Sequence, residues 1–371
     1  MTLRERILAV YQGETPDVVP YMLDLSHWFY HKHQIPWDLS AVHNEPELDL
    51  IAFHKAVGAG FYIPQLPAFY DVRYPEDVAA TATKSEDEST ITWTIETPLG
   101  RLSRTRRWEP KNYAWGIVDW PVQSEQDLGI LRYALSNRTY APHWERYRAW
   151  VEAVGDTGVV YVPTGYSAMG HLLNYWMGVQ NTTYAVFEIP GAVRAFVDAV
   201  NANLLECVDI LAESPAEIII MGDNFSSDIQ PPHFFEKWSK PYYAEAIARL
   251  HKAGKHVAVH IDGRLRGGLG MFAAIGADCA DAVTPSGPGD LTPEACRGEA
   301  GQRMILSGGV PPNLWLPDTD MAAFDQAVLR WLELRASSPR LIANAGDQVP
   351  PGADEARIHR MRDLVEKHGR Y

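Results

Sequence analysis

Residues 256–290 read "HVAVHIDGRLRGGLGMFAAIGADCADAVTPSGPGD", and they contain two strand patterns around one helix pattern. The runs 256–263 and 279–285 are short, apolar and typical of buried strands, whereas residues 267–277 carry apolar side chains at helical spacing. A strand, a helix and a second strand in this order predict a parallel βαβ unit, because parallel strands need a long crossover connection.

The same alternation continues on both sides of this unit. Further strand patterns lie at 18–24, 58–64, 158–165, 216–224, 303–310 and 340–347, with helix patterns between most of them, one of which is expected over 234–254. Eight strands favour a closed (β/α)8 barrel, a TIM barrel, over a doubly wound sheet, because no glycine-rich phosphate loop follows any of them. We therefore predict a single α/β domain over residues 1–371.

One segment interrupts the alternation. Residues 88–110 contain the alternating run "ITWTIE" and the turn "TPLG", which predict a β-hairpin inserted in the N-terminal third of the barrel. Arg104, Arg106 and Arg107 fall in this hairpin, and we expect them on a solvated surface.

Composition excludes several classes of partner. The net charge of −14 over 371 residues argues against nucleic acid and membrane partners, since phosphate backbones and anionic lipids attract basic patches. The N-terminal apolar stretch is too short for a signal peptide, and no run approaches the roughly 18 residues of a membrane span. Three cysteines without repeated spacing, Cys207, Cys279 and Cys296, predict a reducing, cytoplasmic location without disulfides.

The ends of the predicted strands carry the candidate active-site residues, because (β/α)8 enzymes place their sites at the carboxyl ends of the strands. His260 and Asp262 lie two residues apart at one such end, so the strand period places them on the same face. Other predicted strands end on Asp24, Asp223 with Asn224, Asp281 and Asp347. Several carboxylates at one rim need a cation, a shared proton or a basic substrate, although each alone is also a common helix cap.

One imidazole with several carboxylates is a workable ligand set for zinc, manganese or iron. We predict His260, Asp262, Asp281 and Asp347 as metal ligands, and Asp223, Asn224, His260 and Asp262 as catalytic groups. Helix capping remains the alternative for Asp223 and Asn224.

A substrate pocket is predicted from polar and aromatic residues near the rim. Asp24 and His27 are expected in its wall, and no HExxH pattern accompanies the pair His27 and His31. Large aromatic side chains line many small-molecule pockets, with ordinary core packing as the alternative. The candidates for an aromatic wall are Trp28, Trp115, Tyr166 and Trp176.

Four segments together resemble the uroporphyrinogen decarboxylase superfamily, in particular its methyltransferase-like and uncharacterised branches. They read "RERILAVYQGETPDVVP", "GDNFSSDIQPPHFFEKWSKPYYAEAIARLHKAGKHVAVHIDG", "IGADCADAVTPSGPGDLTPEA" and "SGGVPP". The resemblance covers nearly the whole chain and implies a (β/α)8 barrel. It also implies one of two chemistries: cofactor-free decarboxylation, or zinc-assisted methyl transfer involving a thiol, often with a corrinoid protein as methyl carrier.

The chain departs from both branches. The decarboxylase branch has arginines after its first strand, where residues 21–33 here contain none. The methyltransferase branch binds zinc through a His-X-Cys pair and a later cysteine; His260 matches the histidine, while Asp262 and Asp347 stand in the two cysteine positions. Asp281 falls where related zinc sites are acidic. Carboxylates are harder ligands than thiolates, so they admit manganese or iron as well as zinc.

Three functions follow as hypotheses. The first is metal-assisted methyl, or other one-carbon, transfer from a small molecule, with any corrinoid on a separate partner protein because the chain lacks the B12-binding motif. The second is a metal-free decarboxylase, a carboxy-lyase, acting on a carboxylated substrate. The third is a non-catalytic barrel that binds a small molecule. The resemblance also implies a homodimer.

Overall fold

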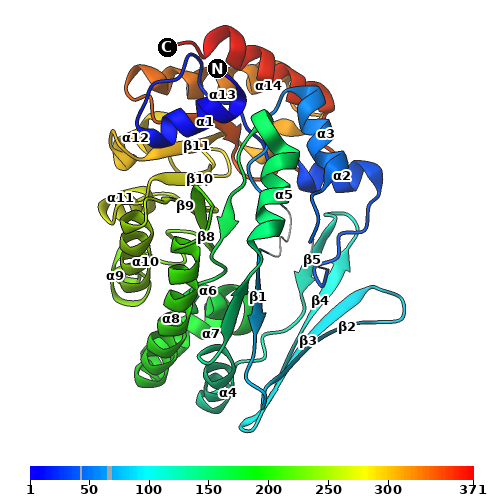
Figure 1. Cartoon of the computed structure of the whole chain (residues 1–371), viewed down its shortest axis with the longest axis vertical. Coiled ribbons are helices and arrows are strands. Elements are labelled where there is room, and N and C mark those ends of the chain that lie inside the picture. Colours follow the sequence, from blue (N-terminus) through cyan, green and yellow to red (C-terminus); the bar gives the residue numbers. More distant parts are fainter. Residues whose placement is uncertain (42–43, 65–68) are drawn as a thin grey trace.

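The computed structural model describes residues 1–41, 44–64 and 69–371. Its main sheet has six parallel strands in the order β12-β11-β10-β9-β8-β7 (Figure 1). The strands are β7 Val162–Pro163, β8 Ile218–Phe225, β9 His256–Ile261, β10 Cys279–Val283, β11 Ile305–Val310 and β12 Leu341–Ala345. Each strand is followed by at least one helix, so the predicted mixed α/β alternation is confirmed over this half of the chain.

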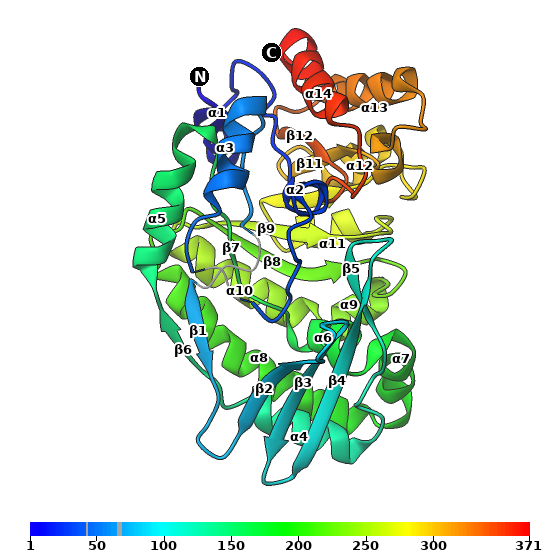
Figure 2. The ribbon, with the colours of Figure 1, turned by 90° about the vertical axis from the view of Figure 1, so that its right-hand side faces the viewer.

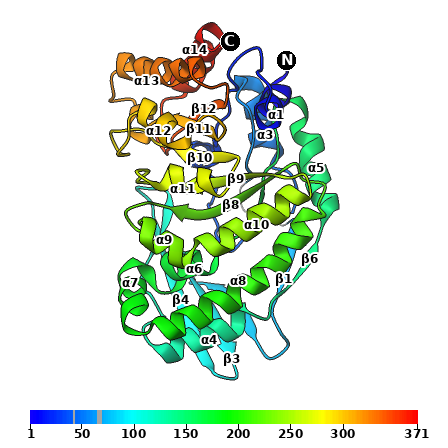
Figure 3. The same ribbon diagram turned by 90° about the vertical axis from the view of Figure 1, so that its left-hand side faces the viewer.

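The helices pack outside this sheet, and Figure 3 shows α8 and α10 along the outer side of β8 and β9. The helices before β8 are α1 Leu3–Gln12, α2 Ser26–His33, α3 Leu48–Val57, α4 Glu125–Leu135, α5 Trp144–Val154, α6 Ala168–His171, α7 Gly178–Glu188 and α8 Pro190–Ala212. A single π-helical turn, η2, joins α6 to α7 over Leu172–Trp176.

The later helices are α9 Pro232–Trp238, α10 Lys240–Lys252, α11 Gly268–Ala274, α12 Pro293–Ala300, α13 Met321–Glu333 and α14 Glu355–His368. The single helix expected over 234–254 is therefore wrong, because the structure divides it at Ser239. Pro241 lies in the first turn of α10, where its missing N–H is tolerated, but it cannot continue a helix from α9.

Isolated parallel bridges extend the main sheet beyond its two edge strands. Tyr21 pairs with Ala343 of β12, Met22 with Gly60, and Phe61 with Gly158, which leads into β7. The strands expected at 18–24 and 58–64 are thus reduced to bridges in the described chain. Pro20 and Pro64 lie within these two segments and have no N–H to donate to a longer ladder.

A compact apolar cluster takes side chains from these segments and from the strands of the main sheet. It contains Met22, Tyr62, Tyr161, Ile220, Ala258, Cys279, Ile305 and Ile342, together with Ile7, Val10 and Tyr11 of α1. The hydroxyls of Tyr11 and Tyr161 lie 2.6 Å apart, which satisfies both polar groups inside the cluster. Helix α1 therefore covers the interior near the amino ends of the strands and leaves their carboxyl ends for the site.

A separate antiparallel sheet lies at the end of the molecule opposite the two termini (Figure 2). Its strands are β2 Ala79–Lys84, β3 Thr90–Thr97, β4 Gly100–Glu109 and β5 Ala114–Ile117, paired in chain order. The hairpin expected over 88–110 falls inside this larger sheet. A two-stranded pair, β1 Tyr70–Arg73 with β6 Thr139–Pro142, lies beside it.

Cys207, Cys279 and Cys296 are buried and unpaired. Within the described ranges, no helix has both the length and the apolarity that crossing a bilayer requires.

Candidate functional site

The alternation of side chains along the strands builds the site. In β9, Ala258 points into the inner cluster, so His260 two residues later points the same way at the carboxyl end. In β10, Cys279 and Asp281 have the same relation. The same spacing, an inner apolar residue followed two positions later by a polar one, occurs in the pairs Met22 and Asp24, Ile305 and Ser307, and Ile342 and Asn344. A layer of polar side chains therefore lies directly above the apolar interior.

This polar layer opens into a cavity of about 760 Å³, a size suited to a small molecule. Most of the predicted site residues line it. They are Asp24, His27, Tyr166, Asn224, His260, Asp262, Asp281 and Asp347, together with Trp115.

His260 and Asp281 form the central contact of the cavity. Their residues pair in register across β9 and β10, and His260 Nδ1 lies 3.3 Å from Asp281 Oδ2. Ser307 Oγ donates to the other carboxylate oxygen at 3.3 Å, and Asn344 Nδ2 donates to Ser307 Oγ at 3.1 Å. This chain of hydrogen bonds fixes the orientation of both the carboxylate and the imidazole.

The pair holds a proton at neutral pH. Burial opposes a charge on His260, but the hydrogen bond to Asp281 and the charges of Asp281, Asp347 and Asp262 raise its pKa to about 9. Burial raises the pKa of Asp347 to about 6, with Asp262 adding to the rise and His260 opposing it. The cavity therefore contains an imidazolium and a carboxyl group that titrates near neutral pH. Groups of this kind can donate a proton to a bound substrate or accept one from it.

The carboxylate of Asp24 also lies in the wall of this cavity, and hydrogen bonds hold it in place. It accepts hydrogen bonds from the backbone N of Ser26 at 2.9 Å and from Gln348 Nε2 at 3.0 Å, and burial raises its pKa. Nearby, His27 Nε2 lies 2.9 Å from the carbonyl oxygen of Tyr113, and burial lowers the pKa of its ring. His27 is therefore a neutral wall residue at pH 7.

Asp223 does not line this cavity, contrary to the catalytic role predicted for it. It lies one residue out of phase with Ile220 and Gly222, so its side chain points away from the interior. Its carboxylate accepts from Ser167 N at 2.6 Å, from Ser167 Oγ and from the Tyr243 hydroxyl at 2.8 Å. Asp223 thus holds the start of α6 against α10.

Two members of the predicted aromatic wall also lie elsewhere. Trp28 is buried in the core, where its Nε1 donates to the carbonyl of Ala353 at 2.9 Å. Trp176 lines a neighbouring cavity instead. Tyr166 and Trp115 are the predicted aromatics that face the strand-end cavity.

The arginines of the inserted sheet are placed differently from the expectation. Arg104 is buried and Arg106 lines the strand-end cavity, while Arg107 is exposed as expected. Along β4, Leu102, Arg104 and Arg106 share one face, and that face packs inward. The alternation of Ile91, Trp93 and Ile95 in the paired strand already indicated that this face is the covered one.

The four predicted metal ligands share the cavity without forming a metal site. In residues 1–41, 44–64 and 69–371, no group of three or more His, Cys, Asp or Glu side chains is arranged to hold a metal ion. His260 and Asp281 bond to each other, and Asp262, in a predicted ligand position, is exposed. The donor set in this arrangement does not fit a bound divalent ion.

A family model and a solved structure agree with this architecture. The family model described as uroporphyrinogen decarboxylase (URO-D) matches residues 166–368, more than half of the chain. A methyltransferase from Methanosarcina mazei matches with a TM-score of 0.66 at 14% identity, over 99% of each chain, which shows a shared fold. D-psicose 3-epimerase from Clostridium cellulolyticum H10 reaches a TM-score of 0.38 at 12% identity, over 62% of this chain and 85% of that one. No curated protein matches the chain significantly.

Proposed function

The chain belongs to the uroporphyrinogen decarboxylase family, and from this premise we propose that it is a carboxy-lyase acting on a small carboxylated molecule. The observation that carries the proposal is the His260–Asp281 pair in one cavity with Arg106. An imidazole held by a carboxylate supplies a proton, and a guanidinium binds an anionic substrate.

We also propose that the barrel is closed and has the (β/α)8 form. The bridges Tyr21 to Ala343, Met22 to Gly60 and Phe61 to Gly158 link β12 to β7 around the open side of the six-stranded sheet. The inner cluster takes side chains from all eight predicted strand segments, as a filled barrel interior requires.

The proposed reaction balances with groups that the cavity contains. Arg106 binds a second carboxylate of the substrate, which leaves the reacting carboxylate near the aspartates. The bond between carbon and the carboxylate breaks, the carboxylate leaves as CO2, and the electron pair stays on carbon. His260 donates its proton to that carbon, Asp281 stabilises the ring in both states, and solvent restores the proton. The substrate therefore carries a group that delocalises the electron pair.

Metal-assisted methyl transfer is the second candidate. The observation in its favour is that His260, Asp262, Asp281 and Asp347 line one cavity. It would take a methyl group from a small molecule, with a separate corrinoid protein as carrier. In the described residues, these side chains are not arranged as a metal site.

The carboxy-lyase proposal predicts CO2 release from at least one member of a panel of small di- and tricarboxylic acids, in protein treated with a chelator. His260→Gln is expected to lower that rate by about 100-fold or more, the usual contribution of a general acid. His251→Gln is the matched control, since it breaks an exterior His–Asp pair, with Nε2 2.8 Å from Asp278. Activity that returns only on addition of a metal ion would contradict the proposal. Binding without any release would favour the non-catalytic barrel.

Elemental analysis separates the two catalytic candidates. The carboxy-lyase proposal predicts that His260→Ala and Asp262→Ala leave the metal content of the purified protein unchanged. About one zinc, manganese or iron per chain, lost in both variants, would instead favour metal-assisted methyl transfer. Circular dichroism of both variants provides the control for folding.

A further inference from the structure

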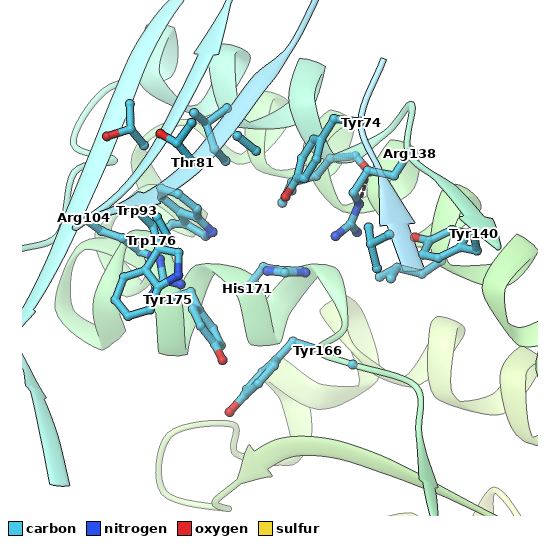
Figure 4. A pocket seen from close by; sticks show the side chains of 18 of the residues that line it. Tyr74, Thr81, Trp93, Arg104, Arg138, Tyr140, Tyr166, His171, Tyr175 and Trp176 are labelled. Carbon is cyan, nitrogen blue, oxygen red and sulfur yellow. Dashed lines mark hydrogen bonds between the residues drawn. The ribbon is translucent and has the colours of Figure 1, made fainter. Parts of the chain in front are cut away.

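A second cavity, of about 420 Å³, lies between the antiparallel sheet and the segment α6–η2 (Figure 4). Its walls come from β1 to β4, the start of β6, and helices α4, α6 and α8. Tyr166 and Tyr175, whose ring centroids lie 4.7 Å apart, form a wall between it and the strand-end cavity. The second cavity is therefore adjacent to the strand-end cavity and shares these two tyrosines with it, while the rest of its lining is different.

Two buried arginines give this cavity a positive charge that no carboxylate among its described lining residues neutralises. Arg138 and Arg104 are only 6% and 8% exposed. Arg138 Nε donates to the carbonyl of Leu135 at 3.1 Å, but its Nη2 has no hydrogen-bond partner among the described residues, nor has Arg104 Nε. No described Asp or Glu lines the cavity. Buried cations are normally paired, so this arrangement indicates a missing anionic partner.

His171 adds a polar group between the two arginines. Figure 4 shows Arg138 reaching toward His171 from the opposite wall, with Arg104 among the indole rings on the other side. His171 Nδ1 is buried and has no partner among the described residues. Burial, followed by the charges of Arg138 and Arg104, lowers its pKa well below the usual value. A neutral ring here offers a hydrogen bond without changing the net positive charge.

The remaining walls suit a flat, apolar body. The guanidinium of Arg104 lies 4.3 Å from the ring centroids of both Trp93 and Tyr175. Further walls come from Tyr70, Tyr74, Tyr140, Trp176, Leu135 and Leu204. Several aromatic side chains can cover both faces of a ring-shaped ligand. A small inorganic anion would instead leave these side chains in contact with water.

From these observations we propose that the second cavity binds an aromatic carboxylate, with its anionic end at Arg138 and Arg104 and its ring between the aromatic walls. The proposal assigns a ligand site separate from the strand-end cavity and does not depend on the reaction proposed there.

The test is calorimetric titration of the whole protein with benzoate, and with benzamide as a neutral compound of the same shape. Benzoate is expected to bind at least about tenfold more tightly than benzamide, because only the carboxylate forms charge-assisted hydrogen bonds. Arg138→Gln and Arg104→Gln are each expected to weaken benzoate binding by about tenfold or more. Quenching of tryptophan fluorescence is a second readout, since Trp93 and Trp176 line the cavity.

Two controls locate the binding. Arg107→Gln removes a guanidinium from the exposed face of the same strand and should leave affinity unchanged. His260→Gln alters the strand-end cavity and should also leave it unchanged. Absence of benzoate binding, equal binding of benzamide, equal competition by inorganic phosphate, or loss of binding only in His260→Gln would each overturn the proposal. The benzamide comparison uses unaltered protein, so it holds even if an arginine variant does not fold.

Discussion

Replacing Asp281 by Asn is expected to lower the pKa of His260 from about 9 to its ordinary value of 6.5 or below. The difference corresponds to a loss of proton affinity of about 300-fold or more. Asp281 provides both the hydrogen bond and the largest charge that hold the proton on His260, whereas burial of the ring opposes it. Once the carboxylate is removed, burial dominates and the neutral imidazole is preferred.

The measurement is an NMR titration of the His260 ring protons in the wild type and the variant. Asp347→Asn is the matched control, because Asp347 acts on His260 through its charge alone and should lower the pKa by less. The charged groups that act on His260 are Asp262, Asp281 and Asp347, and the two substitutions compare the effect of Asp281 with that of Asp347 directly. A His260 pKa in Asp281→Asn within half a unit of the wild type would refute the assignment of the pair.

The same pair makes stability depend on pH with a defined sign. The folded protein holds the His260 proton more tightly than the unfolded chain, since the pKa is raised from 6.5 to about 9. The stabilisation, on the order of 3 kcal/mol, is fully present below pH 6.5 and is lost as the pH rises through 9. The difference in unfolding free energy between wild type and Asp281→Asn should therefore shrink across that interval.

Strand alternation made the main part of the site predictable from sequence. His260 and Asp281 each follow a buried strand residue by two positions, and the structure places both above the inner cluster. The same rule, applied to β8, separates Asn224 from Asp223: Asn224 lines the cavity, and Asp223 faces α10. The alternation from Ile220 through Gly222 therefore already favoured Asn224 over Asp223, and the prediction that both are catalytic did not apply it.

The second cavity was beyond prediction for a different reason. The alternation of Ile91, Trp93 and Ile95 marks the covered face of the hairpin, and Arg104 lies opposite Trp93 on that face. Nothing in the hairpin shows which distant segment covers it. The cover comes from residues distant in sequence, such as Tyr175 and Trp176 of the π-helical turn, which stack on Arg104. By contrast, the break between α9 and α10 was readable locally, since Pro241 signals it.

Gly158→Ala is expected to destabilise the protein by about 3 kcal/mol, at the upper end of the usual cost of overpacking. A Cβ at this position would lie 1.9 Å from the carbonyl oxygen of Phe61 and 2.7 Å from its nitrogen. Both contacts are with backbone, so no side-chain rotation relieves them. The bridge between Phe61 and Gly158, with Val159 N donating to Phe61 O at 2.9 Å, would have to open.

Gly129→Ala is the control, measured in the same urea unfolding experiment. Gly129 lies in helix α4, and a Cβ there would meet nothing within 4 Å. This substitution should stabilise the protein by about 0.5–1 kcal/mol, because alanine has the higher helix propensity. The contrast tests the proposed closure, since the Phe61–Gly158 bridge is one of the isolated contacts that link the two edge strands of the sheet. If Gly158→Ala unfolds at the wild-type urea concentration, these two segments do not approach as described, and the closed barrel loses its support on this side.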